Sequence, residues 1–473
     1  MTAVFFEGNG LRNVREQLGL SQAKLAEITG IPQAALSSFE LGKSILPSQV
    51  VEKINRVLSQ DEKVRGLVDR KKRYRLHEYG TAQRNPVRVK LAEQTSANAQ
   101  YVELLSALDR QRNSSSENSP TALSLFSGCG GFSTGFVWAG FKLLGFVELE
   151  SSFRHIYRDN FPNTEELGAD ITKVTDSQIE GWRRKFGSVD AVIGGPPCQG
   201  FSLSGKRRAD DSRNSLFEHY LRVVEKIQPK VAVLENVRLL TSMRFPDGSL
   251  VATAIRDGFA SKGYDVRTFE VNAKDYGVAQ HRERVIFVAV RKDLGKSPSV
   301  PVPTHGIQGD LFGGNVPYRT FADACSDLDF LESGEKSTKD ELHEAVHHPK
   351  HVIDWLWNVP QGASAHDNED SAMRPPSGYN TTYKRQIWLE PAGTVQTTFG
   401  MISGCRNVHP IATRALTVRE AARIQSFPDS FKFRGSLNAV RTSIGNAVPP
   451  LLSYALGCHI RDAFLNFVEV SRL

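Results

Sequence analysis

Short apolar runs alternate with amphipathic stretches along most of this chain. Residues 189–193 and 231–234 are apolar runs of strand length, and helical stretches lie between such runs. Strands that alternate with helices are typical of a parallel sheet with right-handed crossovers. Residues 266–271 and 285–290 would be the last strands, and we expect them to form an antiparallel edge. The pattern predicts an α/β domain with a doubly wound, Rossmann-like sheet.

Residues 11–58 follow a helical period instead. Leu25 and Ile28 mark the apolar face of a first helix. Gly30 falls where a tight turn is needed, and Pro32 suits the first turn of a second helix. The segment predicts a small all-α domain.

The second helix of this domain has an apolar and a polar side. Leu36 and Phe39 would face the core, whereas Gln33 and Ser37 would point outward. The pattern from residue 21 to 43 is similar to the helix-turn-helix of phage-repressor-like DNA-binding domains. That resemblance implies that Gln33 and Ser37 lie near base edges in the major groove. The alternative is a helical bundle used for dimerisation or packing.

A stiff turn follows the apolar run 189–193. It has the sequence Gly-Gly-Pro-Pro-Cys-Gln-Gly-Phe-Ser at residues 194–202, and its glycines and prolines end the strand abruptly. Cys198 is therefore delivered at the carboxyl end of a strand, where ligands bind in open α/β sheets. A lone cysteine is more often a buried core residue. Here the surrounding residues are costly to keep for packing alone, so we favour a chemical role.

Two further motifs stand at strand ends. Glu-Asn-Val at residues 235–237 closes one apolar run, and Gln-His-Arg-Glu-Arg at residues 280–284 leads into another. The Arg-x-Arg spacing puts Arg282 and Arg284 on one face of an extended chain. Solvent-facing charge is the alternative for these arginines.

A glycine-rich turn joins the first strand of the sheet to a helix. The turn is Phe-Ser-Gly-Cys-Gly-Gly at residues 126–131, and such turns let a ligand approach the backbone closely. Its spacing does not match the dinucleotide fingerprint, which argues against NAD or FAD. The next strand, residues 142–147, ends in Glu148, placed like the acid that binds a ribose.

In the order in which they occur, Pro-Pro-Cys-Gln-x-Phe-Ser, Glu-Asn-Val and Gln-x-Arg-x-Arg resemble the cytosine-C5 DNA methyltransferase family. The resemblance covers roughly residues 121–473 apart from a variable interval, and departs at Ala279, where the family often has proline. It implies methylation of cytosine carbon 5 within a specific double-stranded DNA sequence, with S-adenosylmethionine as methyl donor. It also implies a place in a restriction-modification system.

The resemblance assigns residues of the cofactor pocket. The turn glycines would lie near the methionine part, Glu148 at the ribose hydroxyls and Asp170 near the adenine amino group. The positions implied in this pocket are Phe126, Gly128, Gly130, Glu148, Asp170, Pro196, Leu216 and Asn446.

The reaction explains why the other motifs are needed. Carbon 5 of cytosine is a poor nucleophile, and thiolate addition at carbon 6 makes it reactive toward the methyl group. Cys198 would be that nucleophile. Glu235, held protonated, would donate to N3, and Arg284 would bind O2 with Arg282 beside it. No side chain identifies itself as the base that removes the carbon-5 proton, and a water molecule is an alternative.

The target base must leave the duplex, which costs a few kcal/mol. We expect Gln199 and Ser202 to support the cysteine turn and to contact the DNA backbone. The helix-turn-helix, an addition found in some family members, would suit repression of the enzyme's own operon or of a linked nuclease gene.

Two other functions remain open. One is an RNA cytosine-5 methyltransferase, and the other is a transcriptional regulator with a vestigial methylase domain. The long variable region and the N-terminal DNA-binding pattern argue against the first, and the presence of Cys198, Glu235 and Arg284 together argues against the second.

Composition and charge limit the kind of partner, the cellular compartment and the metal sites that we expect. The chain has 473 residues and a net charge of +7, which favours a polyanionic partner. Its five cysteines form no Cys-x-x-Cys pair, so we expect a reducing compartment and no zinc site. No signal peptide or long apolar run is present, so we expect a cytoplasmic protein without a membrane partner. His305, His347, His348 and His366 show no metal-ligand spacing and are interpreted as surface or groove residues.

We expect five segments in all. They are a helix-turn-helix domain at 1–65, a basic helical linker at 66–120, a catalytic and cofactor-binding domain at 121–292, a target-recognition domain at 293–410 and a return to the catalytic domain at 411–473. Within the linker we expect a helix around 91–108 and an exposed polar stretch at 113–120. The charged residues of 414–428 are expected to be structural.

Overall fold

The computed structural model describes the chain in two compact units, Met1–Gln83 and Arg84–Leu473. In the first it describes residues 11, 12, 15, 21–41, 44, 46, 47, 49–51, 53 and 54, and in the second residues 94–113, 116, 118–197, 216–307, 316–404 and 406–465. No helix in these ranges is both long and apolar enough to traverse a membrane.

The first unit contains the predicted helix pair. Helix α2 (Gln22–Thr29) ends at Gly30, which has a φ of 68°. Helix α3 (Gln33–Glu40) begins after Pro32, which is its N-cap. Leu36 and Phe39 are buried in a small apolar core, as the pattern predicts.

A buried ion pair braces this core. Arg15 donates from Nε and Nη2 to the two carboxylate oxygens of Glu40, at 2.7 and 2.9 Å. Gln22 donates to the same carboxylate at 2.8 Å. Gln33 is exposed and Ser37 half-buried, so α3 keeps a polar side free.

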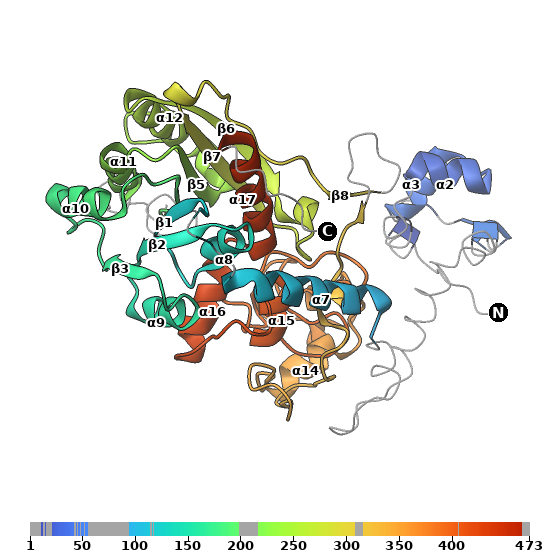
Figure 1. The fold of residues 1–473 in the computed structure, drawn as a ribbon. Helices are drawn as coiled ribbons and strands as arrows, with labels where there is room; N and C mark the ends of the chain where they lie inside the picture. The colour runs from blue at the N-terminus through green and yellow to red at the C-terminus, as the bar shows by residue number, and fades with distance from the viewer. Residues whose placement is uncertain are drawn as a thin grey trace. The chain divides into compact units, whose positions relative to one another are not determined.

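The second unit is organised around a seven-stranded sheet (Figure 1) with the order β3-β2-β1-β4-β5-β7-β6. The strands are β1 (Thr121–Leu125), β2 (Lys142–Val147), β3 (Glu165–Gly168), β4 (Ala191–Gly194), β5 (Val231–Val237), β6 (Tyr264–Asn272) and β7 (Glu283–Arg291). The first five are parallel, and β7 pairs antiparallel with both β5 and β6. The doubly wound sheet and its antiparallel edge are therefore confirmed.

Helices cover both faces of the sheet, and alternate strand residues pack against each face. In β5, Val231 and Val233 join one apolar cluster, whereas Ala232 and Leu234 join the other. The helices on the two faces are α8 (Gly131–Trp138), α9 (Ser151–Asn160), α16 (Leu437–Asn446) and α17 (Pro450–Phe464) on one, and α10 (Asp176–Phe186), α11 (Leu216–Ile227) and α12 (Val251–Ser261) on the other.

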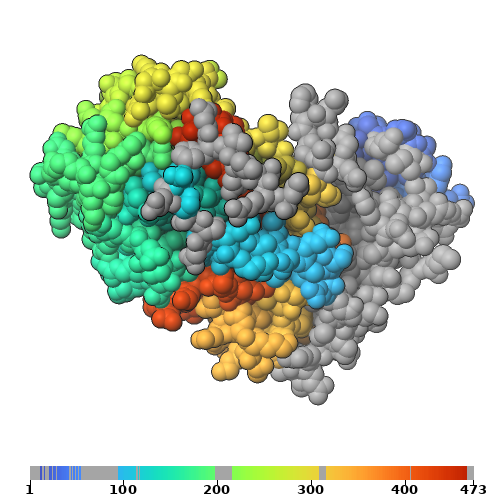
Figure 2. Space-filling view, in the orientation of Figure 1, coloured from blue at the N-terminus to red at the C-terminus, as the bar shows by residue number. Residues whose placement is uncertain are grey.

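Helix α7 (Ser96–Arg110) lies in the stretch that the sequence assigns to a linker. Tyr101 is fully buried, and Leu105 and Leu108 join it in the core cluster of the large unit. The hydroxyl of Tyr101 donates to the carbonyl of Arg423 at 2.9 Å. Figure 2 shows α7 in light blue. It lies between the green segments and the orange segments of the large unit. The catalytic unit thus begins before residue 121, because α7 carries an apolar stripe of its own.

The interval 293–410 is mostly irregular. Its short elements are β8 (His305–Gly306), β9 (Val316–Pro317), α13 (Phe321–Cys325) and α14 (Lys350–Trp357). Val352 and Leu356 of α14 form a small apolar cluster, whereas Phe321 of α13 belongs to the main core.

Short 3-10 helices occur throughout the large unit, at Gln111–Asn113, Arg238–Ser242, Ala273–Tyr276, Lys292–Leu294, Ala365–Asp367 and Ser371–Met373.

Helix α15 (Val418–Ile424) carries the charged residues that the sequence assigns a structural role. The Glu420 carboxylate accepts from both Nη groups of Arg414, at 2.8 and 2.7 Å, and both side chains are buried. Arg423 pairs with Asp327 and Asp429. The prediction of structural charges is confirmed.

One histidine prediction is wrong. His348 is buried rather than at a surface or groove, and its Nε2 accepts from the backbone N–H of Ala415 at 3.0 Å. Its role is to satisfy a backbone donor inside the fold.

Candidate active site

The glycine turn after β1 adopts left-handed backbone at several positions. Phe126, Gly128 and Gly130 have φ values of 51°, 56° and 102°. A Cβ built on Gly130 would lie 2.4 Å from the ring of Phe161, so a side chain is excluded there. A Cβ built on Gly128 meets no atom within 4 Å. Among the described residues, open space therefore lies over Gly128, at the carboxyl end of β1.

Glu148 is tied to this turn. One carboxylate oxygen accepts from the N–H of Gly128 at 2.7 Å, and the other accepts from the N–H of Glu150 at 2.8 Å. Burial raises the pKa of the Glu148 carboxyl, although these hydrogen bonds oppose the shift. Each oxygen keeps a further lone pair for a ligand hydroxyl.

The remaining predicted cofactor residues lie on neighbouring elements. Asp170 follows β3 and accepts from the hydroxyl and the N–H of Thr172, and the hydroxyl bond is the main cause that lowers the pKa of Asp170. Leu216, at the start of α11, packs on the same apolar cluster as Phe126. Asn446 is the exposed last residue of α16.

The turn after β4 approaches β5 closely. A Cβ built on Gly195 would lie 2.9 Å from Oε2 of Glu235, so glycine makes room for this carboxylate. Asn236 donates from Nδ2 to the carbonyl of Pro196 at 2.7 Å. These contacts attach the cysteine turn to the end of β5 as far as residue 197. Cys198, Gln199 and Ser202 lie outside the described residues.

Glu235 and Arg284 meet at the end of β5. Nε of Arg284 lies 2.7 Å from Oε1 of Glu235, and the two side chains are only 11% and 10% exposed. The ladder explains the contact, because Arg284 pairs with Val237 and the side chains of 235 and 237 share a face. Burial lowers the pKa of the Arg284 guanidinium, and Glu235 opposes the shift.

Arg282 is placed differently from its predicted position beside Arg284. It precedes β7 and is 1% exposed. Its Nη1 donates to the carbonyl of Val395 at 3.1 Å, and its Nη2 donates to the carbonyls of Gly445 and Ala447 at 2.8 and 2.9 Å. Both Nη groups therefore bind backbone, from segments on either side of α15.

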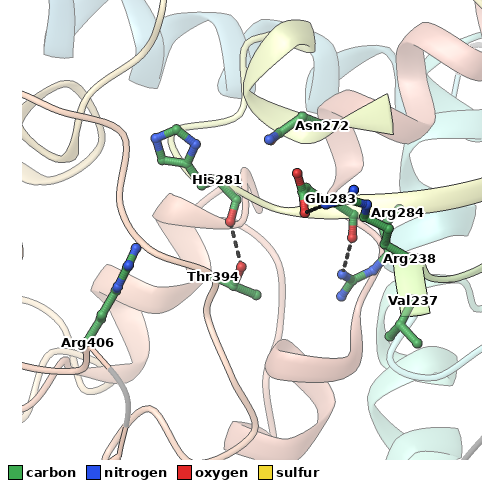
Figure 3. A pocket seen from close by; sticks show the side chains of 8 residues that line it. All are labelled: Val237, Arg238, Asn272, His281, Glu283, Arg284, Thr394 and Arg406. Atoms are coloured by element: carbon green, nitrogen blue, oxygen red, sulfur yellow. Dashed lines mark hydrogen bonds and ion pairs between the residues drawn. The ribbon is translucent and has the colours of Figure 1, made fainter. Parts of the chain in front are cut away.

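A pocket of about 370 Å³ opens next to the Glu235–Arg284 pair. Figure 3 shows two sides of this pocket. One side is formed by residues at the ends of β5 and β7, and the other by Thr394 and Arg406 of the interval 293–410. The hydroxyl of Thr394 donates to the carbonyl of His281 at 2.6 Å and joins the two sides. The lining residues are Val237, Arg238, Asn272, His281, Glu283, Arg284, Thr394 and Arg406.

Of these lining residues, sequence reasoning gave a site role only to Arg284, and the side chains that it missed include Arg238, His281 and Arg406. Arg238 directly follows Glu-Asn-Val, and His281 lies inside Gln-x-Arg-x-Arg, so their positions in the motifs were the available signal. Arg406 lies in the irregular interval, where no periodicity distinguishes it from a surface charge.

Comparison with known proteins identifies the family. Residues 121–462, well over half of the chain, match the family model of the C-5 cytosine-specific DNA methylase. The chain belongs to this family. Residues 11–61 match a helix-turn-helix family, as the sequence pattern predicts.

Individual relatives agree with the family of this cytosine-5 DNA methylase. The Type II methyltransferase M1.HphI of Haemophilus parahaemolyticus is 40% identical over 341 residues, which cover 71% of this chain and 85% of the relative. The Type II methyltransferase M.DdeI of Desulfomicrobium norvegicum is 32% identical over 382 residues, which cover 73% and 89%.

Solved structures share the fold of the methylase. A protein encoded within an Escherichia coli prophage is 25% identical with a TM-score of 0.57, and the match covers 74% of this chain and all of that one. A methyltransferase of Entamoeba histolytica matches 75% of this chain with a TM-score of 0.51, and at 16% identity it shows the fold alone.

The methylase is therefore a DNA cytosine-5-methyltransferase that uses S-adenosylmethionine, and its substrate is DNA. The residues present fit this cofactor. Gly128 leaves open space at the carboxyl end of β1, and Glu148 offers free lone pairs beside it. The RNA alternative and the vestigial domain are less consistent with these relatives than the DNA enzyme.

Proposed function

We propose that this methyltransferase modifies a cytosine within a specific duplex sequence, through Cys198 as nucleophile and Glu235 and Arg284 as the groups that hold the flipped base. The observation that carries the proposal is the buried Glu235–Arg284 pair next to the turn that leads into Cys198. A carboxyl and a guanidinium side by side match the N3 and O2 atoms of one cytosine edge.

The chemistry uses these groups in turn. The thiolate of Cys198 adds to carbon 6, and the electron pair of the 5,6 double bond becomes available at carbon 5. Glu235, when protonated, donates to N3, and Arg284 stabilises the charge that develops on O2. S-adenosylmethionine supplies a methyl group that carbon 5 accepts. Loss of the carbon-5 proton and of the thiolate then restores the aromatic ring.

The cofactor would lie along the carboxyl ends of β1 to β4. Glu148 would accept from the ribose hydroxyls, Asp170 would lie near the adenine amino group and Asn446 near the methionine part. Gly128, over which the described residues leave open space, would let the ligand approach the backbone of the turn closely. Pro196, Phe126 and Leu216 would supply the apolar walls.

Arg282 fits a positioning role better than direct contact with the base. Its bonds to Gly445 and Ala447 flank Asn446, and its bond to Val395 reaches the segment that closes the recognition interval. We therefore place Arg284 against the base and Arg282 behind it, as the link between these two segments.

A labelling experiment tests the proposal. The full chain is incubated with labelled S-adenosylmethionine and mixed-sequence duplex DNA, beside tRNA. We expect label on duplex DNA, none with Cys198→Ala, and a loss of about 10²- to 10⁴-fold with Glu235→Gln, the range for a missing acid. Full activity of Cys198→Ala would exclude the proposed nucleophile, and label on tRNA alone would exclude the proposed substrate.

We further infer that the helix-turn-helix binds operator DNA upstream of the enzyme's own gene, within a restriction-modification system that has a cognate endonuclease as functional partner. The supporting observation is the polar side of α3, where Gln33 is exposed while Leu36 is buried beneath it. Gln33→Ala with Ser37→Ala in the full chain should abolish a mobility shift of upstream DNA and leave methyl transfer unchanged. An intact shift in this double variant would contradict the assigned contacts.

A further inference from the structure

Arg406 is an arginine of the pocket that has no assigned role. Its side chain is exposed, and Figure 3 shows it on the opposite side of the pocket from Arg284 and Arg238. Among the residues that the structure describes, its guanidinium makes no hydrogen bond and no ion pair. It therefore keeps five donors available for an incoming group.

The other two arginines of the pocket each have a carboxylate partner. Arg238 lies 3.0 Å from both Glu270 and Glu283, and Arg284 lies 2.7 Å from Glu235. Of the three, Arg406 is thus the one whose charge is uncompensated within the described ranges. An uncompensated cation in a pocket next to a catalytic pair attracts an anionic part of the substrate.

The backbone of Arg406 is strained in a way that aims this side chain. Its φ is 49°, a left-handed conformation that costs a residue other than glycine about 1–2 kcal/mol. The N–H of Arg406 donates to the carbonyl of Thr381 at 2.9 Å, and Gly393 leaves room for the side-chain stem, since a Cβ there would lie 3.3 Å from Cδ of Arg406. Strained residues of this kind concentrate at ligand sites.

The surroundings of Arg406 add positive charge. His281 lines the same pocket, and its pKa is lowered by burial first and then by the charges of Lys274 and Arg406, with Glu283 opposing them. Lys274 and Arg406 therefore both place positive charge near His281, and the carboxylate of Glu283 opposes them. A net positive region favours a charged phosphate over an uncharged base edge.

We propose that Arg406 binds a backbone phosphate of the DNA strand that carries the target cytosine. This inference rests on the proposed function, because Glu235 and Arg284 must hold the flipped base for the strand to run through the pocket. The phosphate contact would fix the register of the strand against the catalytic unit, without reading its sequence.

The salt dependence of methyl transfer tests this contact. Initial rates are measured for the full chain and for the variants Arg406→Gln, Arg406→Lys and Arg256→Gln, with labelled S-adenosylmethionine and a duplex of randomised sequence. Arg256 is an exposed arginine on α12 that lines no part of the pocket, so its variant removes the same charge elsewhere. The Michaelis constant for DNA is determined from 50 to 200 mM NaCl.

We expect Arg406→Gln to raise the KM for DNA and to lower the slope of log KM against log salt by about 0.9, the value for one phosphate contact. Its deficit relative to the wild type should then shrink about 3.5-fold across this salt range. Arg406→Lys should retain most of the slope, and Arg256→Gln all of it. The set of methylated sequences, read by bisulfite sequencing, should stay the same.

Each opposing outcome has its own meaning. A wild-type slope in Arg406→Gln would overturn the phosphate contact, and a changed set of methylated sequences would show that Arg406 reads a base instead. Absence of label with the wild-type chain would be a failure of the proposed function and not of this inference alone.

Discussion

At the scale of single residues, the catalytic pair depends on a glycine. Gly195 lies where a Cβ would approach Oε2 of Glu235 to 2.9 Å, and it shows no left-handed φ that alanine would resist. Alanine at this position would therefore act on the carboxylate and not on the local backbone. The size of residue 195 sets where Glu235 can be.

We predict that Gly195→Ala lowers kcat by about 10²-fold, because a displacement near 1 Å in a catalytic group has effects of this size. The KM for S-adenosylmethionine should change little. Steady-state kinetics measures both constants. Gly181→Ala, whose Cβ would meet nothing closer than Nη2 of Arg184 at 3.9 Å, is the matched control. Equal kcat values for the two variants would refute the steric argument.

At the scale of elements, the strand ladder explains what the sequence could predict. Glu235 and Arg284 lie inside β5 and β7 and meet across the ladder, and the family resemblance had assigned both of them to one edge of the same cytosine. Arg282 lies before β7, where alternation no longer holds, and its carbonyl partners come from residues more than 100 positions away. The pattern of residues along one strand cannot predict contacts between residues so far apart in the chain. Arg406 was missed for another reason, because it lies in an irregular interval where no periodicity distinguishes it from a surface charge.

The links made by Arg282 give a prediction for the cofactor. Arg282→Lys cannot fork to Gly445 and Ala447, and two hydrogen bonds of about 1 kcal/mol each should be lost. We expect the KM for S-adenosylmethionine to rise about thirtyfold, the effect of roughly 2 kcal/mol. Arg385, a fully buried arginine that donates to Val359 and Leu356, is the matched control. If Arg385→Lys raises this KM equally, the loss of any buried arginine is sufficient and the positioning role is excluded.

The buried ion pair between Glu420 and Arg414 makes the stability of the fold depend on pH. Burial opposes ionisation of Glu420, but the Arg414 guanidinium outweighs it and holds the pKa of the carboxyl well below its usual range. The stabilisation is present above the unfolded-state pKa of about 4.3 and is lost as pH falls below it. We predict that Glu420→Gln costs about 3–5 kcal/mol at pH 7 and flattens the acid limb of the unfolding profile. Urea denaturation at several pH values measures both, and an unchanged acid limb would contradict the assignment.

At the scale of the whole molecule, the boundary between the two units lies at a different residue from the predicted one. The polar stretch at 113–120 suggested a linker, but α7 on its N-terminal side buries Tyr101, Leu105 and Leu108 in the large core. A shift in composition therefore marks an exposed loop within a domain as well as a linker between domains. The burial of the flanking helix distinguishes these two cases.

Truncation checks the boundary. Removal of residues 1–83 should preserve methyl transfer and thermal stability of the large unit. Removal of residues 1–120 should destabilise it strongly, since each of the three buried side chains is worth about 1.5–3 kcal/mol. Thermal unfolding and labelling assays compare the two forms. Equal melting temperatures would show that α7 is dispensable.

The antiparallel insertion of β7 between β5 and β6 has a consequence for how such an enzyme can change over generations. The Glu235–Arg284 pair is fixed by the ladder between β5 and β7, two strands that are mostly buried on both faces, and a one-residue slip there would turn Arg284 away from Glu235. The interval that follows β7 is short of regular structure and tolerates substitution and insertion more readily. We propose that target choice resides in this interval, so that chemistry and target choice lie in parts of the chain with opposite tolerance to mutation and new specificities can arise while the reaction is inherited intact.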